Sequence, residues 1–392
     1  MELERPVFDG DNHYYEALDA FTRHLDPRHR RRVIEWAEID GRRYHVIGGR
    51  VNHTVVNPTF DPVAPAGALS SYFRGNPDGR SPLELLKARE PIRPEYRDRD
   101  ARLAVMDAQG IDKVWLFPTL GMVYEEPLKH DPGAVVLMFQ AFNRWLEDDW
   151  GYAYQDRIFA SPYLTLADPV AAVDEVERVL GLGARTVCLR PAAAFTDRGA
   201  LPPTDPVFDP VWARLAEAGV TVVAHAGDSG YTANGYALDG FSTDFAGGGR
   251  PSIKMLAMER AIYDFLACLV FDKLFDRFPN LRVASVENGS EFLGDLFRKL
   301  QSVGRRLPGW FSEDPVETFR RHIWVNPFWE DDVHEVVGHM GADRVVFGSD
   351  WPHIEGLTQP LDYVVELKEL SDADQRRILH DNAIELNTPR PS

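Results

Sequence analysis

The chain of 392 residues has the length of one large domain or of two ordinary ones. It is 44% hydrophobic, 11% aromatic and 27% charged, which is typical of a folded globular protein and excludes a largely disordered chain. The 43 basic and 61 acidic residues give a formal net charge of −18, which disfavours attraction to nucleic acid or to anionic lipid. We therefore expect neither nucleic acid nor a membrane among the partners of this protein.

Cysteine usage and the apolar segments bear on the cellular location. Cys188 and Cys268 lie far apart in the chain and lack the close spacing of a thiolate zinc site or a redox pair. The first residues, Met-Glu-Leu-Glu-Arg-Pro, lack the basic and then apolar pattern of a secretory signal, and no stretch approaches the roughly 18 consecutive apolar residues of a membrane span. The sequence thus predicts a protein of the reducing cytoplasm.

Eight short apolar runs follow one another along the chain, and segments with helical periodicity separate them. The predicted strands are 6–13, 113–119, 158–164, 185–191, 220–227, 281–289, 323–328 and 344–350. The predicted helices are 134–150, 169–182, 209–218, 255–278, 290–303, 331–340 and 361–386. This alternation predicts an α/β fold, the closed (β/α)8 TIM barrel. The alternative is an open doubly wound sheet, but no Gly-x-Gly-x-x-Gly turn follows the first run.

Two segments exceed what such a barrel needs, and both follow predicted strands at the face where barrel enzymes place their active sites. Residues 14–100 include a predicted hairpin, 32–36 and 42–47, around the Ile39-Asp40-Gly41 turn. We interpret 14–100 as an insertion that caps the barrel or forms a dimer contact, within a single domain that spans 1–392. The second segment, 228–254, is expected to be a lid or pocket wall; the alternative is an ordered surface loop.

Polar residues end several of the predicted strands. Asp11 and His13 end the first, His225 the fifth, Glu287 the sixth and Asp350 the eighth. Each has a simpler explanation taken singly, such as a turn cap or a buried histidine. Because a barrel gathers the carboxyl ends of its strands around one axis, these imidazoles and carboxylates together predict a divalent metal site. The second and seventh strands end in Pro118-Thr119 and Pro327-Phe328, which offer no such group.

Four short motifs carry a family resemblance. They are Asp9-Gly10-Asp11-Asn12-His13, Ala224-His225-Ala226-Gly227, Glu287-Asn288-Gly289 and Phe347-Gly348-Ser349-Asp350-Trp351-Pro352. In order and strand placement the chain resembles the amidohydrolase superfamily, in the branch of 2-amino-3-carboxymuconate 6-semialdehyde decarboxylase and γ-resorcylate decarboxylase. The resemblance implies one divalent ion held by Asp11, His13, His225 and Asp350.

The sequence departs from this family at two positions. Asp11 stands where many relatives carry histidine, and Glu287 stands where a histidine of the sixth strand commonly serves as acid or base. The extra carboxylates make Mn²⁺ or Fe²⁺ as plausible as Zn²⁺. Glu287 is either a direct ligand or a proton donor, and we favour the second role. The expected catalytic residues are therefore Asp350, Glu287 and His225.

Three further residues are candidates for binding substrate. Arg190 ends the fourth strand and is placed either to clamp a substrate carboxylate or to pair with acids of the site. His353, shortly after Asp350, either orients a ligand or contacts substrate, with a solvent-exposed loop histidine as the alternative. Arg74, in the insertion, is a weaker candidate for the task of Arg190.

These features leave three functional hypotheses. The first is non-oxidative decarboxylation of a small carboxylated aromatic or unsaturated acid, with Glu287 or Asp350 as proton donor. The second is hydrolysis of an amide, ester, lactone or C–C bond, in which Asp350 takes a proton from a metal-activated water. The third, a barrel that lost its chemistry and serves as a metabolite-binding or assembly protein, is disfavoured because all four expected ligands are present. A homodimer is expected in each case.

Overall fold

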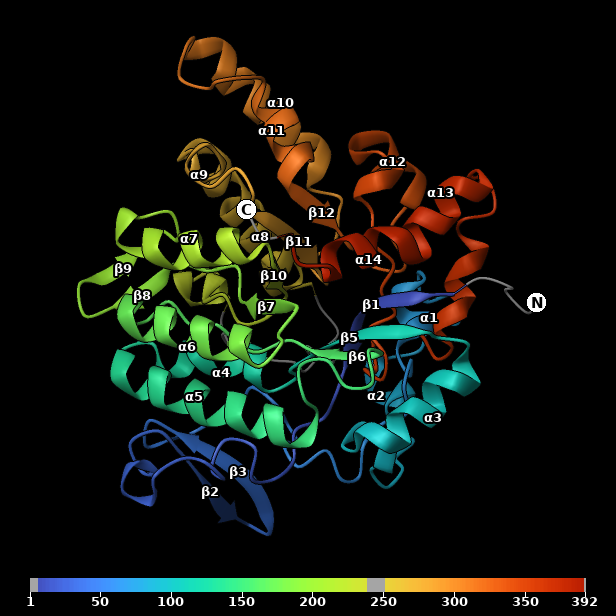
Figure 1. Cartoon of the computed structure of the whole chain (residues 1–392). Coiled ribbons are helices and arrows are strands. Elements are labelled where there is room, and N and C mark those ends of the chain that lie inside the picture. Colours follow the sequence, from blue (N-terminus) through green and yellow to red (C-terminus); the bar gives the residue numbers. More distant parts are fainter. Residues whose placement is uncertain (1–5, 238–250, 391–392) are drawn as a thin grey trace.

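The computed structural model describes residues 6–237 and 251–390, and these form a closed barrel of parallel strands wrapped by helices (Figure 1). The barrel strands are β1 (Phe8–His13), β5 (Lys113–Phe117), β6 (Ile158–Ala160), β7 (Thr186–Leu189), β10 (Thr221–His225), β11 (Arg282–Val286) and β12 (Ile323–Val325). They form two parallel arcs, in the order β1-β5-β6 and β7-β10-β11-β12. The predicted TIM barrel is confirmed.

Bridges between single residue pairs close the barrel. Tyr163 pairs with Cys188 between the arcs, and Val345 pairs with Val325 on β12. The prediction of a regular strand over 344–350 is wrong. The segment nevertheless occupies the eighth position of the barrel, between β12 and β1. It contacts β1 through single backbone hydrogen bonds, from Gly10 to the carbonyl of Phe347 and from Ser349 and Asp350 to the carbonyl of Asp11. Ser349 of this segment donates hydrogen bonds from its backbone N–H and its hydroxyl to the carboxylate of Asp9 on β1, so a side chain replaces part of the backbone ladder.

Crossover helices cover the outside of the barrel in chain order. They are α3 (Arg99–Gln109), α5 (Pro132–Asp149), α6 (Pro169–Gly181), α7 (Asp209–Ala218), α8 (Ala257–Phe271), α10 (Leu293–Arg306) and α12 (Val333–Met340), with α14 (Asn382–Asn387) at the end of the chain. Their starts follow from local sequence: Asp131 and Asp168 cap α5 and α6, and each precedes a proline that suits the first helical position. Four wholly buried tryptophans, Trp115, Trp145, Trp150 and Trp212, belong to the core between barrel and helices.

Shorter elements complete the fold, and several were not predicted from the sequence. They are α1 (Ser70–Phe73), α2 (Pro82–Leu85), α4 (Gly121–Leu128), α9 (Leu274–Arg277), α11 (Pro315–His322), α13 (Asp372–Arg376), the strand pair β8 (Ala194–Thr196) and β9 (Gly199–Leu201), the 3-10 turns η1 (Pro27–His29), η2 (Pro94–Tyr96), η3 (Pro206–Phe208), η4 (Tyr231–Asn234), η6 (Ile253–Leu256), η7 (Ala342–Arg344) and η8 (Pro360–Val365), and the π-helical turn η9 (Arg377–Asp381). The predicted helix 255–278 is interrupted near Lys273, whose φ of 58° is left-handed. The predicted helix 361–386 is likewise broken, because Ser371 caps a new start at α13.

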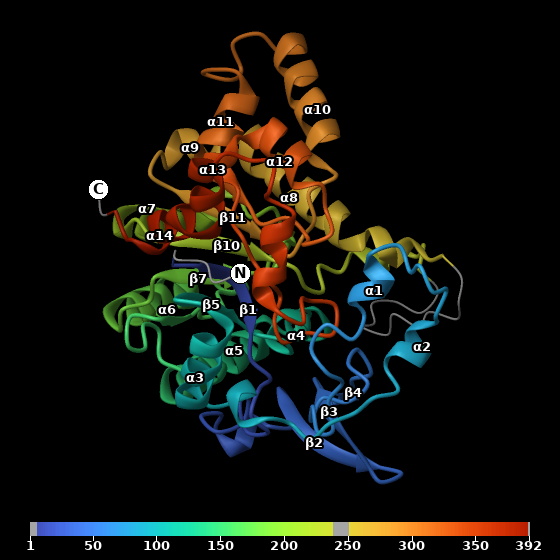
Figure 2. The same cartoon turned by 90° about the vertical axis from the view of Figure 1, so that its right-hand side faces the viewer.

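The insertion between β1 and α3 contains the predicted hairpin. Its strands are β2 (Ile34–Ile39) and β3 (Arg42–Ile47), with the short β4 (Arg50–Val51) beside β3, and this sheet lies at one side of the barrel (Figure 2). Asp40 and Gly41 have φ of 50° and 73°, as a two-residue hairpin turn of type I′ requires. The insertion also reaches the catalytic face, where Gly67 and Leu69 donate backbone hydrogen bonds to the carbonyls of His353 and Ile354.

Of the predicted loop 228–254, residues 238–250 lie outside the described residues, including Phe241 and Phe245. Across the ranges 6–237 and 251–390, no helix combines the length and apolar character needed to cross a bilayer.

Candidate metal centre

Five side chains predicted from the sequence meet at the carboxyl ends of the strands. The Nε2 atom of His13 lies 3.3 Å from Asp11 Oδ1, 3.5 Å from Glu287 Oε2 and 3.4 Å from Asp350 Oδ1. The Nε2 atom of His225 lies 3.4 Å from Asp11 Oδ1 and 3.5 Å from Glu287 Oε2. Residues from the ends of β1, β10 and β11 and from the segment 344–350 therefore form one cluster around His13 and Glu287.

The donor atoms are oriented as a cation would require. His225 Nδ1 lies 2.9 Å from the carbonyl oxygen of Ala226, which can only accept, so Nδ1 carries the proton and Nε2 presents its lone pair. Within the described chain, the buried atoms Asp11 Oδ1, His13 Nε2, His225 Nε2 and Asp350 Oδ1 have no hydrogen-bond partner. Buried polar atoms without partners are costly, and four that converge fit a bound divalent ion.

The spacing supports the same conclusion. Two atoms that each lie about 2.1 Å from one ion are separated by about 3.0 Å at a right angle and about 3.4 Å at a tetrahedral angle. The donor distances of 3.3 to 3.5 Å among His13, His225 and the three carboxylates fall close to these values. The residues present therefore fit one divalent metal ion.

Charge in the centre is balanced between acids and imidazoles. Burial raises the pKa of Asp350 above its ordinary value, and the charge of Glu287 raises it further. Burial disfavours the charged form of Asp11 as well, but the nearby imidazoles of His13 and His225 hold its pKa below the ordinary value. Burial opposes protonation of His13, yet Asp11 and Glu287 raise its pKa to about 10. The carboxylates thus favour positive charge at their centre.

Backbone strain concentrates at the same place. Glu287 and Asp350 have φ of 56° and 55°, in the left-handed region that residues other than glycine rarely adopt. Such conformations persist where the surroundings impose them, and they cluster at functional sites. Here the backbone N–H of Glu287 donates to Asn326 Oδ1 at 3.3 Å, and that of Asp350 donates to the Asp11 carbonyl at 2.8 Å.

Two residues that were not predicted from the sequence, Arg102 and Asn326, support the ends of the first and sixth strands. Arg102, buried in α3, donates to the carbonyl of His13 at 2.7 Å and also to the side chain of Asn12. Asn326, at the end of β12, supports Glu287 although the seventh strand was expected to offer no functional group. Asn326 was visible in the sequence just before Pro327, whereas nothing local connects Arg102 to a site 90 residues away.

The centre opens toward solvent at Glu287. Its side chain is 18% exposed, compared with 3% for Asp11 and 1% for each of His13 and His225. Asp350 is 9% exposed, so Glu287 is the most exposed of the five side chains.

The three substrate-binding candidates occupy different positions. His353 stacks on His13 with ring centroids 3.9 Å apart, and its Nδ1 lies 2.6 Å from Asp350 Oδ1, so the alternative of a solvent-exposed loop histidine is wrong. Arg190 is buried. Leu189 of β7 pairs with Ala224 of β10, so the residues that follow them, Arg190 and His225, lie level with each other.

The two arginines already have protein partners. Arg190 donates to Glu126 Oε2 at 2.5 Å and to the Asp228 carbonyl at 2.7 Å, and a carboxylate oxygen of Glu125 lies 3.7 Å away. Arg74 is half exposed, lies over the ring of Trp329 at 4.8 Å and donates to Glu366 at 3.0 Å. A role of either arginine in substrate binding stays a prediction.

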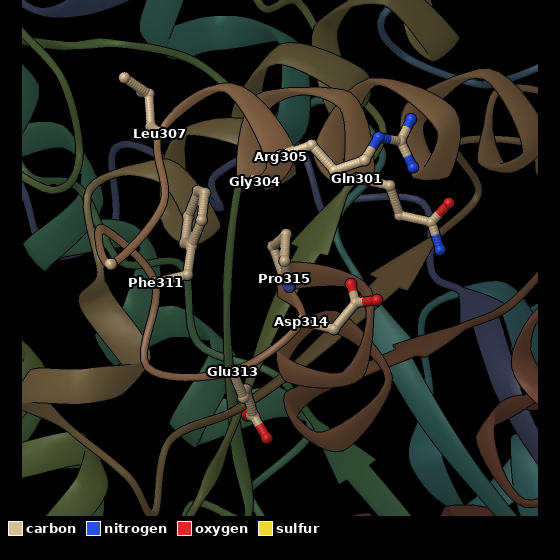
Figure 3. Close-up of a pocket in the computed structure, with 9 residues that line it drawn as sticks. Gln301, Gly304, Arg305, Leu307, Phe311, Glu313, Asp314 and Pro315 are labelled. Carbon is tan, nitrogen blue, oxygen red and sulfur yellow. The ribbon is translucent and has the colours of Figure 1, made fainter.

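A separate hollow of about 310 Å³ lies at the end of α10 (Figure 3). It is lined by Gln301, Gly304, Arg305, Leu307, Gly309, Phe311, Glu313, Asp314 and Pro315. A crossover helix runs antiparallel to the strand before it, so this end of α10 lies toward the face opposite the strand ends. None of its lining residues belongs to the metal centre.

Fold and site together define a class of protein: a (β/α)8 barrel enzyme with a metal centre of imidazoles and carboxylates at its carboxyl face. The family model described as Amidohydrolase matches residues 74–386, so the chain belongs to the amidohydrolase family. An amidohydrolase from Mycobacterium avium subsp. paratuberculosis is 44% identical, covers 98% of this chain and all of its own, and superposes with a TM-score of 0.91. The predicted superfamily is confirmed.

More distant relatives carry decarboxylase names. The 2-amino-3-carboxymuconate-6-semialdehyde decarboxylase of Dictyostelium discoideum is 26% identical over 127 residues, which span 31% of this chain and only 34% of that protein. A dihydroxybenzoic acid decarboxylase from Polaromonas, solved with manganese and 2-nitroresorcinol, is 20% identical, covers 82% of this chain and 92% of its own, and has a TM-score of 0.59. At that identity the second likeness shows the fold alone.

Proposed function

We propose that this protein is a metal-dependent decarboxylase that removes CO₂ from a small carboxylated aromatic or unsaturated acid. The observation that carries the proposal is that donor atoms of Asp11, His13, His225 and Glu287 lie within 4.8 Å of one another, and that Asp350 and His353 form a second such group with His13 and Glu287. Several of these buried donor atoms have no hydrogen-bond partner among the described residues. The decarboxylase names of several relatives support the reaction type.

Each residue has a distinct task in this proposal. Asp11, His13, His225 and Asp350 hold the ion, with His225 fixed by its hydrogen bond to Ala226. A divalent ion held there would supply Lewis-acid stabilisation of negative charge on the substrate. Mn²⁺, Fe²⁺ and Zn²⁺ all suit this donor set of nitrogen and oxygen.

Glu287 delivers the proton. It donates to the substrate carbon that bears the carboxylate, so a C–H bond forms there. The C–C bond to the carboxylate then breaks, its electron pair returns to the substrate and CO₂ leaves. Glu287 takes a new proton from solvent, which it reaches more readily than the buried ligands do. Arg190, level with His225, is proposed to orient the substrate, with His353 and Arg74 as further contacts.

Cell location and assembly complete the proposal. The free thiols of Cys188, which is buried, and Cys268 fit a reducing cytoplasm. The insertion 14–100 is proposed to cap the barrel mouth, supported by its hydrogen bonds to the loop after Asp350, and to contribute to a homodimer. Light scattering of the purified protein measures the oligomeric state, and a monomer at micromolar concentration would contradict the dimer.

The reaction is tested with 2,6-dihydroxybenzoate, 5-carboxyvanillate and a panel of lactones and amides. Decarboxylation predicts CO₂ release and, in D₂O, one deuterium on the carbon that lost the carboxylate. The competing hydrolase hypothesis predicts ¹⁸O from H₂¹⁸O in the product and no CO₂. Incorporation of ¹⁸O into a cleaved lactone or amide, together with no CO₂ from any acid, would overturn the proposal.

A further inference from the structure

His353 faces the metal centre through one nitrogen and the end of β5 through the other. Its Nε2 lies 2.8 Å from Thr119 Oγ1, and the single hydroxyl proton of Thr119 is donated to the Tyr14 carbonyl at 2.8 Å. Thr119 must therefore accept from His353, so Nε2 of His353 carries the ring proton. The Nδ1 atom of the neutral ring then bears a lone pair.

That lone pair is directed at a predicted metal ligand. His353 Nδ1 lies 2.6 Å from Asp350 Oδ1, yet the described structure gives neither atom a hydrogen-bond partner. Two acceptors at this distance repel each other unless positive charge lies between or beside them. One donor atom each of His13, Glu287, Asp350 and His353 lies within 4.8 Å of every other, which is a group suited to hold a cation. This group shares His13 and Glu287 with the group of Asp11, His13, His225 and Glu287.

Thr119 is itself held in place. Its backbone N–H donates to Glu16 Oε1 at 3.0 Å, and the N–H of Gly121 donates to the same oxygen at 3.0 Å. Glu16 is buried, so the connection between β5 and α4 is fixed by a carboxylate that solvent does not reach. The position of the Thr119 hydroxyl is therefore set by the fold.

We infer that His353 Nδ1 is a further ligand of the divalent ion, and that Thr119 is the positioning residue that fixes the tautomer of His353. This inference rests on the proposed metal centre. It assigns a function to the end of the second strand, where the sequence indicated none.

The experiment counts histidine nitrogens on Mn²⁺ by pulsed electron paramagnetic resonance of protein labelled with ¹⁵N-histidine. The wild type is expected to show three coupled nitrogens, from His13, His225 and His353, and His353→Gln to show two. The Mn²⁺ dissociation constant is expected to rise about tenfold or more in His353→Gln and in Thr119→Val, and to stay near wild type in Thr119→Ser.

The outcomes separate this inference from the proposed function. Two nitrogens in both wild type and His353→Gln, with equal metal affinity, would overturn the inference and leave the metal centre intact. Wild-type affinity in Thr119→Val would overturn the positioning role. A wild type that binds no Mn²⁺, Fe²⁺ or Zn²⁺ would overturn the metal centre and the inference together. Circular dichroism of each variant verifies that it is folded.

Discussion

Glu287 lies within reach of both imidazoles and of solvent, and its two candidate roles predict different results for one substitution. If Glu287 is the proton donor, Glu287→Gln keeps the shape of the side chain but removes the acidic proton. The value of kcat should then fall about 10²- to 10⁴-fold while metal content is unchanged. Steady-state kinetics and metal analysis of the same preparation measure both. Loss of the ion along with activity would instead make Glu287 a ligand.

The candidate ligands could be predicted from sequence because each directly ends a strand. A barrel brings such positions together whatever the loops do, so the sequence alone predicts that Asp11, His13, His225, Glu287 and Asp350 lie close together. The partners of Arg190 could not be predicted, because Glu125 and Glu126 lie on α4, a helix with no clear apolar period. Thr119 and Asn326 act through other residues, and sequence alone does not show such contacts.

At the scale of elements, the segment that completes the barrel depends on a close approach at Gly348. A Cβ atom there would lie 2.3 Å from Asp11 Cβ and 2.7 Å from Asn326 Nδ2. Gly348→Ala should therefore destabilise the protein by about 1 to 3 kcal/mol and, because it displaces Asp11, weaken metal binding about tenfold or more. Urea unfolding and metal titration measure the two effects.

A matched control is Gly338→Ala in α12, where an added Cβ meets nothing within 4 Å. In a helix this change should stabilise by up to about 1 kcal/mol and leave metal affinity unchanged. If the two alanine variants behaved alike, close packing of Gly348 against Asp11 would not be what positions this ligand.

The inserted sheet is anchored by a buried histidine whose protonation opposes folding. His45 on β3 shares a 2.7 Å hydrogen bond with the hydroxyl of Tyr124 on α4, and burial lowers its pKa from 6.5 to about 3. Below pH 6.5 the unfolded chain binds a proton that the folded chain does not, so stability falls as pH drops toward 3.

His45→Gln removes this titration and keeps a hydrogen-bonding side chain. The wild type should lose about 2 kcal/mol more than His45→Gln between pH 6.5 and about pH 5. Guanidinium unfolding at the two pH values measures the difference, with the exposed His53→Gln as control. Equal slopes in the wild type and His45→Gln would contradict burial of a neutral histidine at this contact.

Periodicity located the barrel elements well and the surface elements poorly. The helix 209–218 was predicted with the bounds of α7, because its apolar stripe faces the barrel over its whole length. The hairpin was predicted from Asp40-Gly41, although β2 begins at Ile34 and runs to Ile39. The eighth strand and the last helix are less regular in the structure than the prediction. Hydrogen bonds of side chains such as Asp9 and Ser371 interrupt the backbone patterns that apolar spacing alone suggests.

At the scale of the whole molecule, the ion should stabilise the fold because it binds only the folded arrangement of strand ends. At a free metal concentration about 100 times the dissociation constant, the gain should be about 2.7 kcal/mol. Thermal unfolding with and without a chelator measures it, and His225→Ala should show a much smaller dependence on metal. A wild type that melts at the same temperature in both conditions would contradict a structural contribution of the ion.

The central claim is that one divalent ion joins the ends of the first, fifth and eighth barrel segments. A crystal structure of the protein loaded with Mn²⁺, with anomalous scattering to locate the ion, tests it most directly. The account predicts one strong anomalous peak about 2.0 to 2.4 Å from donor atoms of Asp11, His13, His225 and Asp350. A peak elsewhere, or a peak beyond bonding distance of Asp11 or His225, would contradict it.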